Sequence, residues 1–448
     1  MAKEYRQLSA TEIDLLKLQG CSAANWNDVL VSEVFIAGNV RDVQFSGLVK
    51  IGDNSGTIDF SGGLVRNCGI YDACIHNCTI GDHVYIRHIF NYMANYDVED
   101  YAILENIELC LVDEETSFGN GIKVSTLDET GGRRVMIYDK LSAHLAYFLA
   151  WYKHRHCLIQ ELETKISEYA ESVKSSRGII GEHSVIRNCR QIKNVKFGPY
   201  GSVVGANRLE NGSVNSNEFA PVKLGAGIIA EDFIISSGSE ISDGTIVSHC
   251  FIGQGCILGK QYSAENSLFF ANCQGFHGEA CSIFGGPYTV THHKSTLLIA
   301  GMFSFCNAGS GSNQSNHMYK LGPIHHGIVE RGSKTTSDSY ILWPAKIGAF
   351  TLVMGRHYKN TDTSDLPFSY LIENKDDSWI APGVNLRSVG TIRDVMKWPK
   401  RDKRKDPEKL DCINFNLLSP FTIKKMQKGL DILNSLKEIS GETTEVFA

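Results

Sequence analysis

The feature that most constrains this chain is an aliphatic residue that recurs every six positions, commonly followed by glycine and a polar residue. The pattern is clearest in the stretch Ile252-Gly253-Gln254-Gly255-Cys256-Ile257-Leu258-Gly259. A period of six fits short strands joined by tight turns. Three such sides close one coil, so that apolar side chains stack at the strand spacing of about 4.8 Å.

The repeat therefore predicts a parallel β-helix over residues 34–110 and 178–350. The residues expected to point into its core are Ile80, Ile86, Ile180, Ile186, Leu224, Ile241, Ile252 and Leu258. An ordinary β-sandwich with glycine-rich turns is the alternative. The six-residue phasing argues against it, because the phasing recurs in several separate stretches of the chain.

Departures from the repeat divide the chain into five parts. Residues 1–33 should form a helix and a loop, residues 34–138 a first β-helix block and connector, and residues 178–396 the main β-helix with irregular functional loops. Apolar residues at helical spacing predict an α-helical insertion over 139–177, with one long helix or two shorter ones at 141–174. Residues 397–448 should hold a charged linker, solvated over 397–411, and a C-terminal helix opened by Ser419-Pro420.

Composition excludes several classes of function. The formal net charge of -6 argues against nucleic acid as a partner. No apolar run approaches 18 residues, so no membrane span is expected, and without a signal-peptide core the chain should be cytoplasmic. The 13 cysteines are then expected to be reduced. Because no CxxC pair occurs, no structural zinc site is expected.

Chemistry-bearing residues gather in residues 277–357, which hold seven of the 15 histidines. The polar run 307–317 is expected to be a loop whose backbone amides bind an anionic small-molecule substrate, with a histidine transferring a proton. A solvated loop with incidental histidines is the alternative. The candidate catalytic residues are His292, His293, His317, His325 and His326. The candidate substrate-binding residues are Lys294, Ser310, Asn313, Ser315, Asn316, Arg331, Lys334, Arg356 and His357.

The stretch from about Gly285 to Arg404 contains YTVTHHKSTLLIAGMFSF, NAGSGSNQSNHMYKLGPIHHG, TTSDSYILWPAKIGAF and APGVNLRSVGTIRD. It resembles an uncharacterised bacterial family, common among gut Bacteroidetes, that is labelled as hexapeptide-repeat transferases. The repeats themselves resemble the hexapeptide-repeat acyltransferase superfamily, whose members form left-handed parallel β-helices. The fold class implied is mainly β, a left-handed parallel β-helix with an α-helical insertion and a C-terminal helical extension.

That resemblance implies an acyltransferase with a histidine general base, acting on a sugar or nucleotide-sugar acceptor. The donor would be acetyl-CoA or another acyl-CoA, and the protein would be a homotrimer with its sites between subunits. Ser248-His249-Cys250 matches the superfamily's His-Asp-Cys pattern only loosely, because the aspartate is missing. His249 therefore ranks below the histidines at 292–326.

Two other functions stay open. The chain could be a non-catalytic trimeric scaffold or ligand-binding protein. It could also be a metalloenzyme like the γ-class carbonic anhydrases, which share the fold and bind zinc through three histidines. His83 and His88 have a spacing found there, but no third ligand is evident and His76 is a poor candidate. No bound metal is therefore expected.

Overall fold

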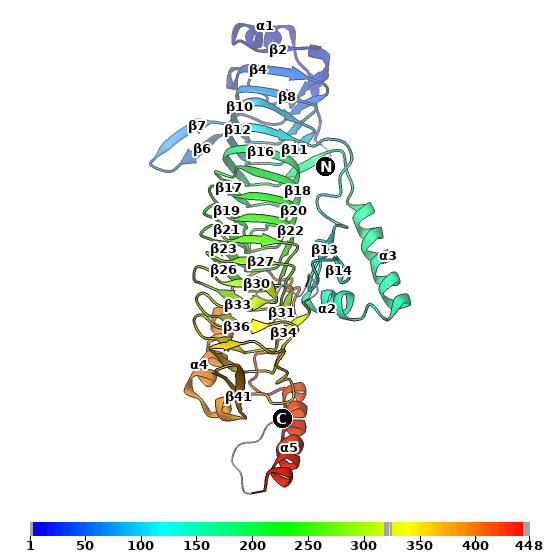
Figure 1. Cartoon of the computed structure of the whole chain (residues 1–448). Helices are drawn as coiled ribbons and strands as arrows, with labels where there is room; N and C mark the ends of the chain where they lie inside the picture. The colour runs from blue at the N-terminus through cyan, green and yellow to red at the C-terminus, as the bar shows by residue number, and fades with distance from the viewer. Residues whose placement is uncertain (1–2, 318–321, 323–324, 442–448) are drawn as a thin grey trace.

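The computed structural model describes residues 3–317, 322 and 325–441. This part of the chain is mainly β. It forms a parallel β-solenoid of about 19 turns, to which five α-helices are attached (Figure 1). The predicted fold class, a parallel β-helix with a helical insertion and a C-terminal helix, is confirmed.

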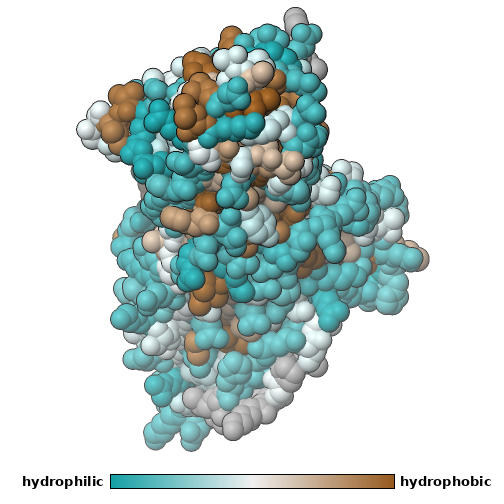
Figure 2. Space-filling view, turned by 90° about the horizontal axis from the view of Figure 1, so that it is seen from above, coloured by the Kyte–Doolittle hydropathy of each residue, from teal (hydrophilic) through white to brown (hydrophobic). Residues whose placement is uncertain are grey.

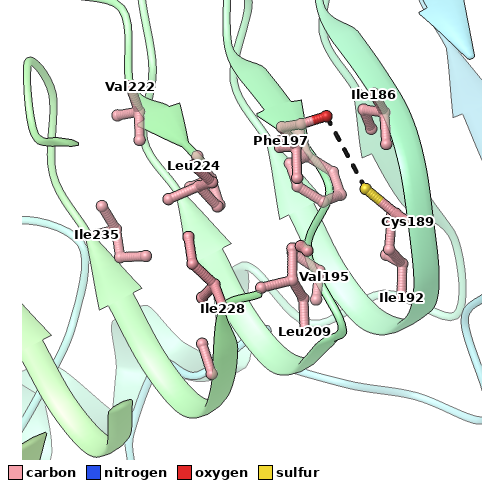
Figure 3. Packing of buried hydrophobic residues seen from close by; sticks show 14 of the residues in the cluster. Ile186, Cys189, Ile192, Val195, Phe197, Leu209, Val222, Leu224, Ile228 and Ile235 are labelled. Carbon is pink, nitrogen blue, oxygen red and sulfur yellow. Dashed lines mark hydrogen bonds between the residues drawn. The ribbon is translucent and has the colours of Figure 1, made fainter. Parts of the chain in front are cut away.

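The coils stack in register, as the six-residue phasing requires. The strands β20 (Ile229–Ile235), β22 (Ile246–Ile252) and β24 (Ser263–Glu265) pair in parallel, so that Ala230, Val247 and Ala264 lie above one another. Figure 3 shows aliphatic side chains of neighbouring coils pointing into one interior. All eight residues predicted to point inward are at most 2% exposed, which confirms that prediction. Full burial of one such side chain stabilises the fold by roughly 1.5–3 kcal/mol.

The other long strands belong to the same sheet. They are β4 (Val40–Ser46), β8 (Gly69–His76), β10 (Tyr85–Ala94), β12 (Ile103–Leu111), β16 (Val185–Phe197) and β18 (Arg208–Val214). Helix α1 (Ala10–Leu18) covers the N-terminal end and begins at Ser9, whose side chain and that of Glu12 form a reciprocal capping box. The antiparallel hairpin of β6 (Thr57–Phe60) and β7 (Leu64–Asn67) projects from the first block (Figure 1).

The insertion occupies residues 112–177, between β12 and β15 (Gly178–Ile180), and consists of a β-hairpin and two helices. The hairpin pairs β13 (Lys123–Ser125) with β14 (Arg134–Met136), and it is followed by α2 (Ala143–Trp151) and α3 (His156–Ser172). The helical prediction for residues 141–174 is thus confirmed, and of its two forms, one long helix or two shorter ones, the structure has the second. The insertion packs on outward-facing apolar side chains of successive coils, which include Ile234, Phe251, Leu268 and Phe284.

The C-terminal part begins with a hairpin of β40 (Tyr370–Asn374) and β41 (Asp377–Ala381), followed by α4 (Val389–Lys397). Residues 398–418 then lead to α5 (Pro420–Ser440), which begins at Ser419 as predicted. Most residues of the predicted solvated linker, 397–411, are exposed or half-buried, but Arg404 and Asp411 are buried. Arg404 forms an ion pair with Asp402 at 2.7 Å, and the Asp411 carboxylate accepts the backbone N–H groups of Ala143 and Ala271.

The surface of the molecule is mixed. Viewed from above, onto its N-terminal end, several hydrophobic patches lie among polar residues (Figure 2). Leu18, Val34 and Val65 are among the exposed apolar residues of this end. In the described ranges, no helix has both the length and the apolar character that a membrane crossing needs.

Candidate functional site

One corner of the solenoid is built from residues in the left-handed region of backbone space. Because strand register aligns the residues that precede it, the corner falls at equivalent positions in successive coils. Most of these residues are Asn or Asp, types that tolerate positive φ. In order, they are Asn194, Asn211, Asp232, His249, Asn266, Ser282 and Ala300, with φ between 44° and 55°.

Two departures from the repeat, the insertion and a connection in the main block, leave the solenoid at this same corner. Leu111 pairs with Lys193, the residue before Asn194, and the insertion begins directly after Leu111. In the main block, β30 (Leu297–Ile299) and β31 (Gly301–Phe303) are separated by a single corner residue. One coil later, residues 316–326 separate β33 (Asn313–Ser315) from β34 (Gly327–Val329). We call this connection, of which the structure describes residues 316, 317, 322, 325 and 326, the histidine loop.

Residues 112–129 of the insertion run along this corner. Backbone N–H groups of Asp113, Gly119 and Ser125 donate to the side-chain oxygens of Asn194, Asn211 and Asn266 at 2.8, 3.2 and 3.4 Å. Further along, the N–H of Leu127 donates to the carbonyl of Ser282 at 2.6 Å. The corner thus guides the tip of the β13–β14 hairpin to the coils next to the histidine loop.

The hairpin tip contacts the three histidines of the histidine loop, and we call this contact the histidine junction. The Glu129 carboxylate lies 3.1 Å from Nε2 of His325, and it accepts the Cys281 thiol at 3.4 Å. The rings of His317 and His325 meet edge to face, with centroids 5.5 Å apart. One ligand atom each from Glu129, His317 and His325 lies within 4.8 Å of the other two.

His326 contacts the hairpin through other residues than His325 does. Its Nε2 accepts a hydrogen bond from Nε of Arg133 at 3.2 Å and lies 3.7 Å from a carboxylate oxygen of Asp128. Arg133 is held by α2, because its guanidinium lies 4.6 Å from the ring of Trp151 and donates to the carbonyl of Ala150. The ring of His326 is about 29% exposed, whereas that of His325 is fully buried.

Burial dominates the electrostatics of this junction. It lowers the pKa of His325, a shift that the Glu129 carboxylate opposes. Burial lowers the pKa of His326 too, and the neighbouring Arg133 adds to that shift. Burial, together with Glu129, raises the pKa of the Cys281 thiol to about 12. Both histidines are therefore neutral near pH 7, when imidazole nitrogens can accept protons or bind metals.

Comparison with known proteins places this chain in a family. The family described as "Domain of unknown function (DUF4954)" matches residues 5–437. The chain belongs to it. A relative in Treponema pallidum (strain Nichols), described as an uncharacterized protein, is 28% identical over 457 residues. That match covers 97% of this chain and 62% of the relative, so the chain spans less than two thirds of the relative's length.

The DUF4954 chain brings together three of the five candidate catalytic histidines and separates the other two. His317, His325 and His326 share the junction. His292 hydrogen-bonds to Gln274 at 2.7 Å and stacks on Phe276, and His293 is exposed beside it. The convergence predicted for the whole group is therefore found only for the histidine loop.

Most of the candidate substrate-binding residues contact other parts of the chain. Arg331 lies 4.5 Å from the ring of Phe305, Lys334 forms an ion pair with Asp394 of α4, and His357 is buried against Ser378. The Arg356 side chain donates to the carbonyl of Asp338 at 3.4 Å, and that of Asn316 donates to the carbonyl of Gly322. The Asn313 side chain accepts the Ser315 hydroxyl. Ser310 and Lys294 accept through their backbone carbonyls, from the N–H groups of Asp338 and Gly311.

The polar run 307–317 is not one loop, contrary to the prediction. It contains β32 (Asn307–Ala308) and β33, and Gln314 lies in the interior, in register with Leu298 and Ile341. Short polar side chains can complete a coil because they bond to the backbone at its turns. The hydroxyl of Ser312, for example, donates to the carbonyl of Gly309 at 2.7 Å.

The half of the junction that the insertion supplies is not evident from the sequence. Asp128, Glu129 and Arg133 precede the histidine loop by more than 180 residues, in the segment predicted to hold the first β-helix block and connector. Cys281 is one of the 13 cysteines for which the sequence predicts only a reduced thiol. The signal that could have drawn attention to the segment is the density of charge just before Gly131-Gly132, within Asp128-Glu129-Thr130.

A separate cleft of about 410 Å³ lies between the insertion, the coils and residues 406–410. Its polar lining includes Asp139, Tyr169, Lys196 and Ser236. Asp139 is already engaged there by the Tyr169 hydroxyl, Lys196 and Asn215. The histidine junction is therefore a partly buried contact between two segments rather than the wall of this cleft.

Proposed function

We propose that this protein is an acyltransferase that uses His326 as its general base at the junction of the insertion and the histidine loop. The observation that carries the proposal is the hydrogen bond from Arg133 to His326 Nε2. Arginine can only donate, so this nitrogen carries a lone pair, which is the form that a base requires.

The surroundings of His326 fit an anionic substrate. The ring is partly exposed, and a cation lies directly beside its basic nitrogen. A phosphate group of a coenzyme A thioester or of a nucleotide sugar would attract the Arg133 guanidinium. The acceptor hydroxyl would then take the place of Arg133 at Nε2, with Asp128 close enough to favour the imidazolium that forms.

In the proposed step, His326 takes the proton of an acceptor hydroxyl while the oxygen attacks the thioester carbonyl. A carbon–oxygen bond forms and the carbon–sulfur bond breaks, so that coenzyme A leaves as a thiolate. The proton held by His326 then neutralises that thiolate. The homotrimer and the sugar or nucleotide-sugar acceptor belong to this proposal, and the resemblance to hexapeptide-repeat acyltransferases supports them.

The test is release of free thiol from acetyl-CoA and longer acyl-CoA esters, in the presence of a panel of sugars and nucleotide sugars. Loss of a general base costs about 10²–10⁴-fold in rate, so His326→Ala should lower turnover by at least about 100-fold. His76→Ala is the matched control, because His76 is exposed and bonds to Ser46, in the first β-helix block. Equal turnover of the wild type and His326→Ala would contradict the proposal.

A scaffold without catalytic activity is the competing function. The buried apolar contact between the insertion and the coils favours the scaffold, because such a contact fixes the shape of the molecule whether or not a reaction takes place. A chain that neither binds nor turns over any acyl-CoA, and whose His326→Ala variant keeps its stability, would favour the scaffold.

A further inference from the structure

Glu129, His317 and His325 lie close together, and the hydrogen bond between Glu129 and His325 does not explain why His317 is near them. Two of the side chains, Glu129 and His317, are exposed, and His325 is buried. Their ligand atoms lie within 4.8 Å of one another although they come from two separate excursions of the chain. His317 does not take part in the bond between Glu129 and His325, yet its ring is held against that of His325.

A second observation concerns the other nitrogen of His325. Among the residues that the structure describes, Nδ1 of His325 is buried and has no hydrogen-bond partner. A buried polar atom without a partner costs about 1–3 kcal/mol, so such atoms are uncommon and call for an explanation. An ion between these side chains would bind Nε2, the nitrogen that faces Glu129, and Nδ1 would then carry the ring proton. The ion itself therefore does not give Nδ1 a partner.

We propose that Glu129, His317 and His325 bind a divalent transition-metal ion, with Zn²⁺ as the first choice. Two imidazoles and one carboxylate are a common ligand set for zinc and also for non-haem iron, while Mg²⁺ and Ca²⁺ prefer oxygen ligands alone. Three protein ligands leave a position open for water or substrate, which is typical of catalytic rather than structural zinc sites.

The geometry requires only a small contraction. Zinc–ligand bonds of about 2.0–2.2 Å place the donor atoms of a tetrahedral site roughly 3.3–3.6 Å apart. The Glu129–His325 distance of 3.1 Å is already of this size. Glu129, at the hairpin tip, and His317, at the edge of the histidine loop, are the exposed members, so they can move the remaining ångström.

This proposal departs from the sequence expectation of no bound metal. That expectation considered cysteine pairs and a triad of histidines, and here the third ligand is a carboxylate from a distant segment. The metal site does not rest on the proposed acyl transfer. It uses His325 rather than His326, and its test measures metal bound per chain and not turnover.

The experiment uses the full chain with Cys157→Ser and Cys412→Ser, because these two exposed thiols could bind zinc adventitiously. After treatment with a chelator, the protein is titrated with Zn²⁺ and, for its absorption spectrum, with Co²⁺. The wild-type ligand set should bind about one ion per chain and raise the melting temperature, because ligands that bind only the folded state stabilise it.

Glu129→Gln and His317→Ala should each weaken binding by roughly 100-fold or more, since even the groups that merely orient metal ligands contribute 10–100-fold. Both residues are exposed, and the metal-free variants should keep the melting temperature of the metal-free parent. Glu279→Gln and His76→Ala are the matched controls and should bind like the parent. A parent that takes up neither ion, or binding that is unchanged in both ligand variants, would overturn the proposal.

Discussion

The docking of the insertion depends on a column of apolar side chains on the outside of the solenoid. Ile234, Phe251, Leu268 and Phe284 are in register in successive coils and face α2 and the β13–β14 hairpin. On a bare solenoid this face would be solvated. Phe251 is fully buried, and its ring lies 5.6 Å from that of Phe270.

We predict that Phe251→Ala favours undocking of the insertion without unfolding the coils. Truncation of a buried Phe costs about 3–5 kcal/mol, and the side chain removed here packs in the cluster that joins coils and insertion. The ladder bond from Phe251 N–H to the Ser267 carbonyl is a backbone bond and is retained. At about 1.4 kcal/mol per factor of ten, the population of the undocked insertion should rise by roughly 100- to 4,000-fold.

Hydrogen exchange followed by mass spectrometry would measure this directly. Amides of α2 should lose protection by that factor, while amides of β16 should change little, because coils in a solenoid contact only their neighbours. Ile246→Ala is the matched control, since Ile246 lies on the same strand but is 47% exposed. The reasoning is refuted if Phe251→Ala and Ile246→Ala leave α2 equally protected.

Three further outcomes are expected. Asp411→Ala should leave the buried N–H groups of Ala143 and Ala271 without an acceptor, at about 1–3 kcal/mol each, and make residues 397–418 sensitive to limited proteolysis. The Arg6 hydrogen bond lowers the pKa of Glu12 from 4.5 to about 2, so the protection factors of α1 should fall as pH drops through that range, and Glu12→Gln should abolish this pH dependence. Light scattering should give three times the chain mass, and a monomer mass at micromolar concentration would refute the trimer.

The core was predictable because its signal is local. An inward aliphatic residue such as Ile252 is required in every coil, so the six-residue phasing is repeated many times along the sequence. Helices were predictable for the same reason, since the change to helical spacing within residues 141–174 needs no knowledge of distant segments. Gln314 shows the limit of this reasoning, because the coil framework can bury a polar side chain that the pattern assigns to a loop.

The candidate site was predictable only in part. The histidine loop was found because its three histidines are close together in the sequence. The carboxylates were not found, since nothing local in Asp128-Glu129 says where the hairpin tip will dock. The pairing of strands between coils decides that position. The insertion leaves the solenoid after Leu111 at the same corner at which residues 316–326 later leave it.

The shared corner also explains why the site lies several coils away from the point where the insertion leaves. A segment that leaves a solenoid at a corner can follow that corner at little cost, because the Asn and Asp side chains there offer acceptors to its backbone N–H groups. Asn194, Asn211 and Asn266 do so in turn. The chain therefore follows this row of corner residues as far as the row extends. The row ends at the coil in which the histidine loop replaces the single corner residue, and the β13–β14 tip lies there. A substitution that removes one of these acceptors, such as Asn266→Ala, should displace Glu129 from His325 before it disturbs the coils.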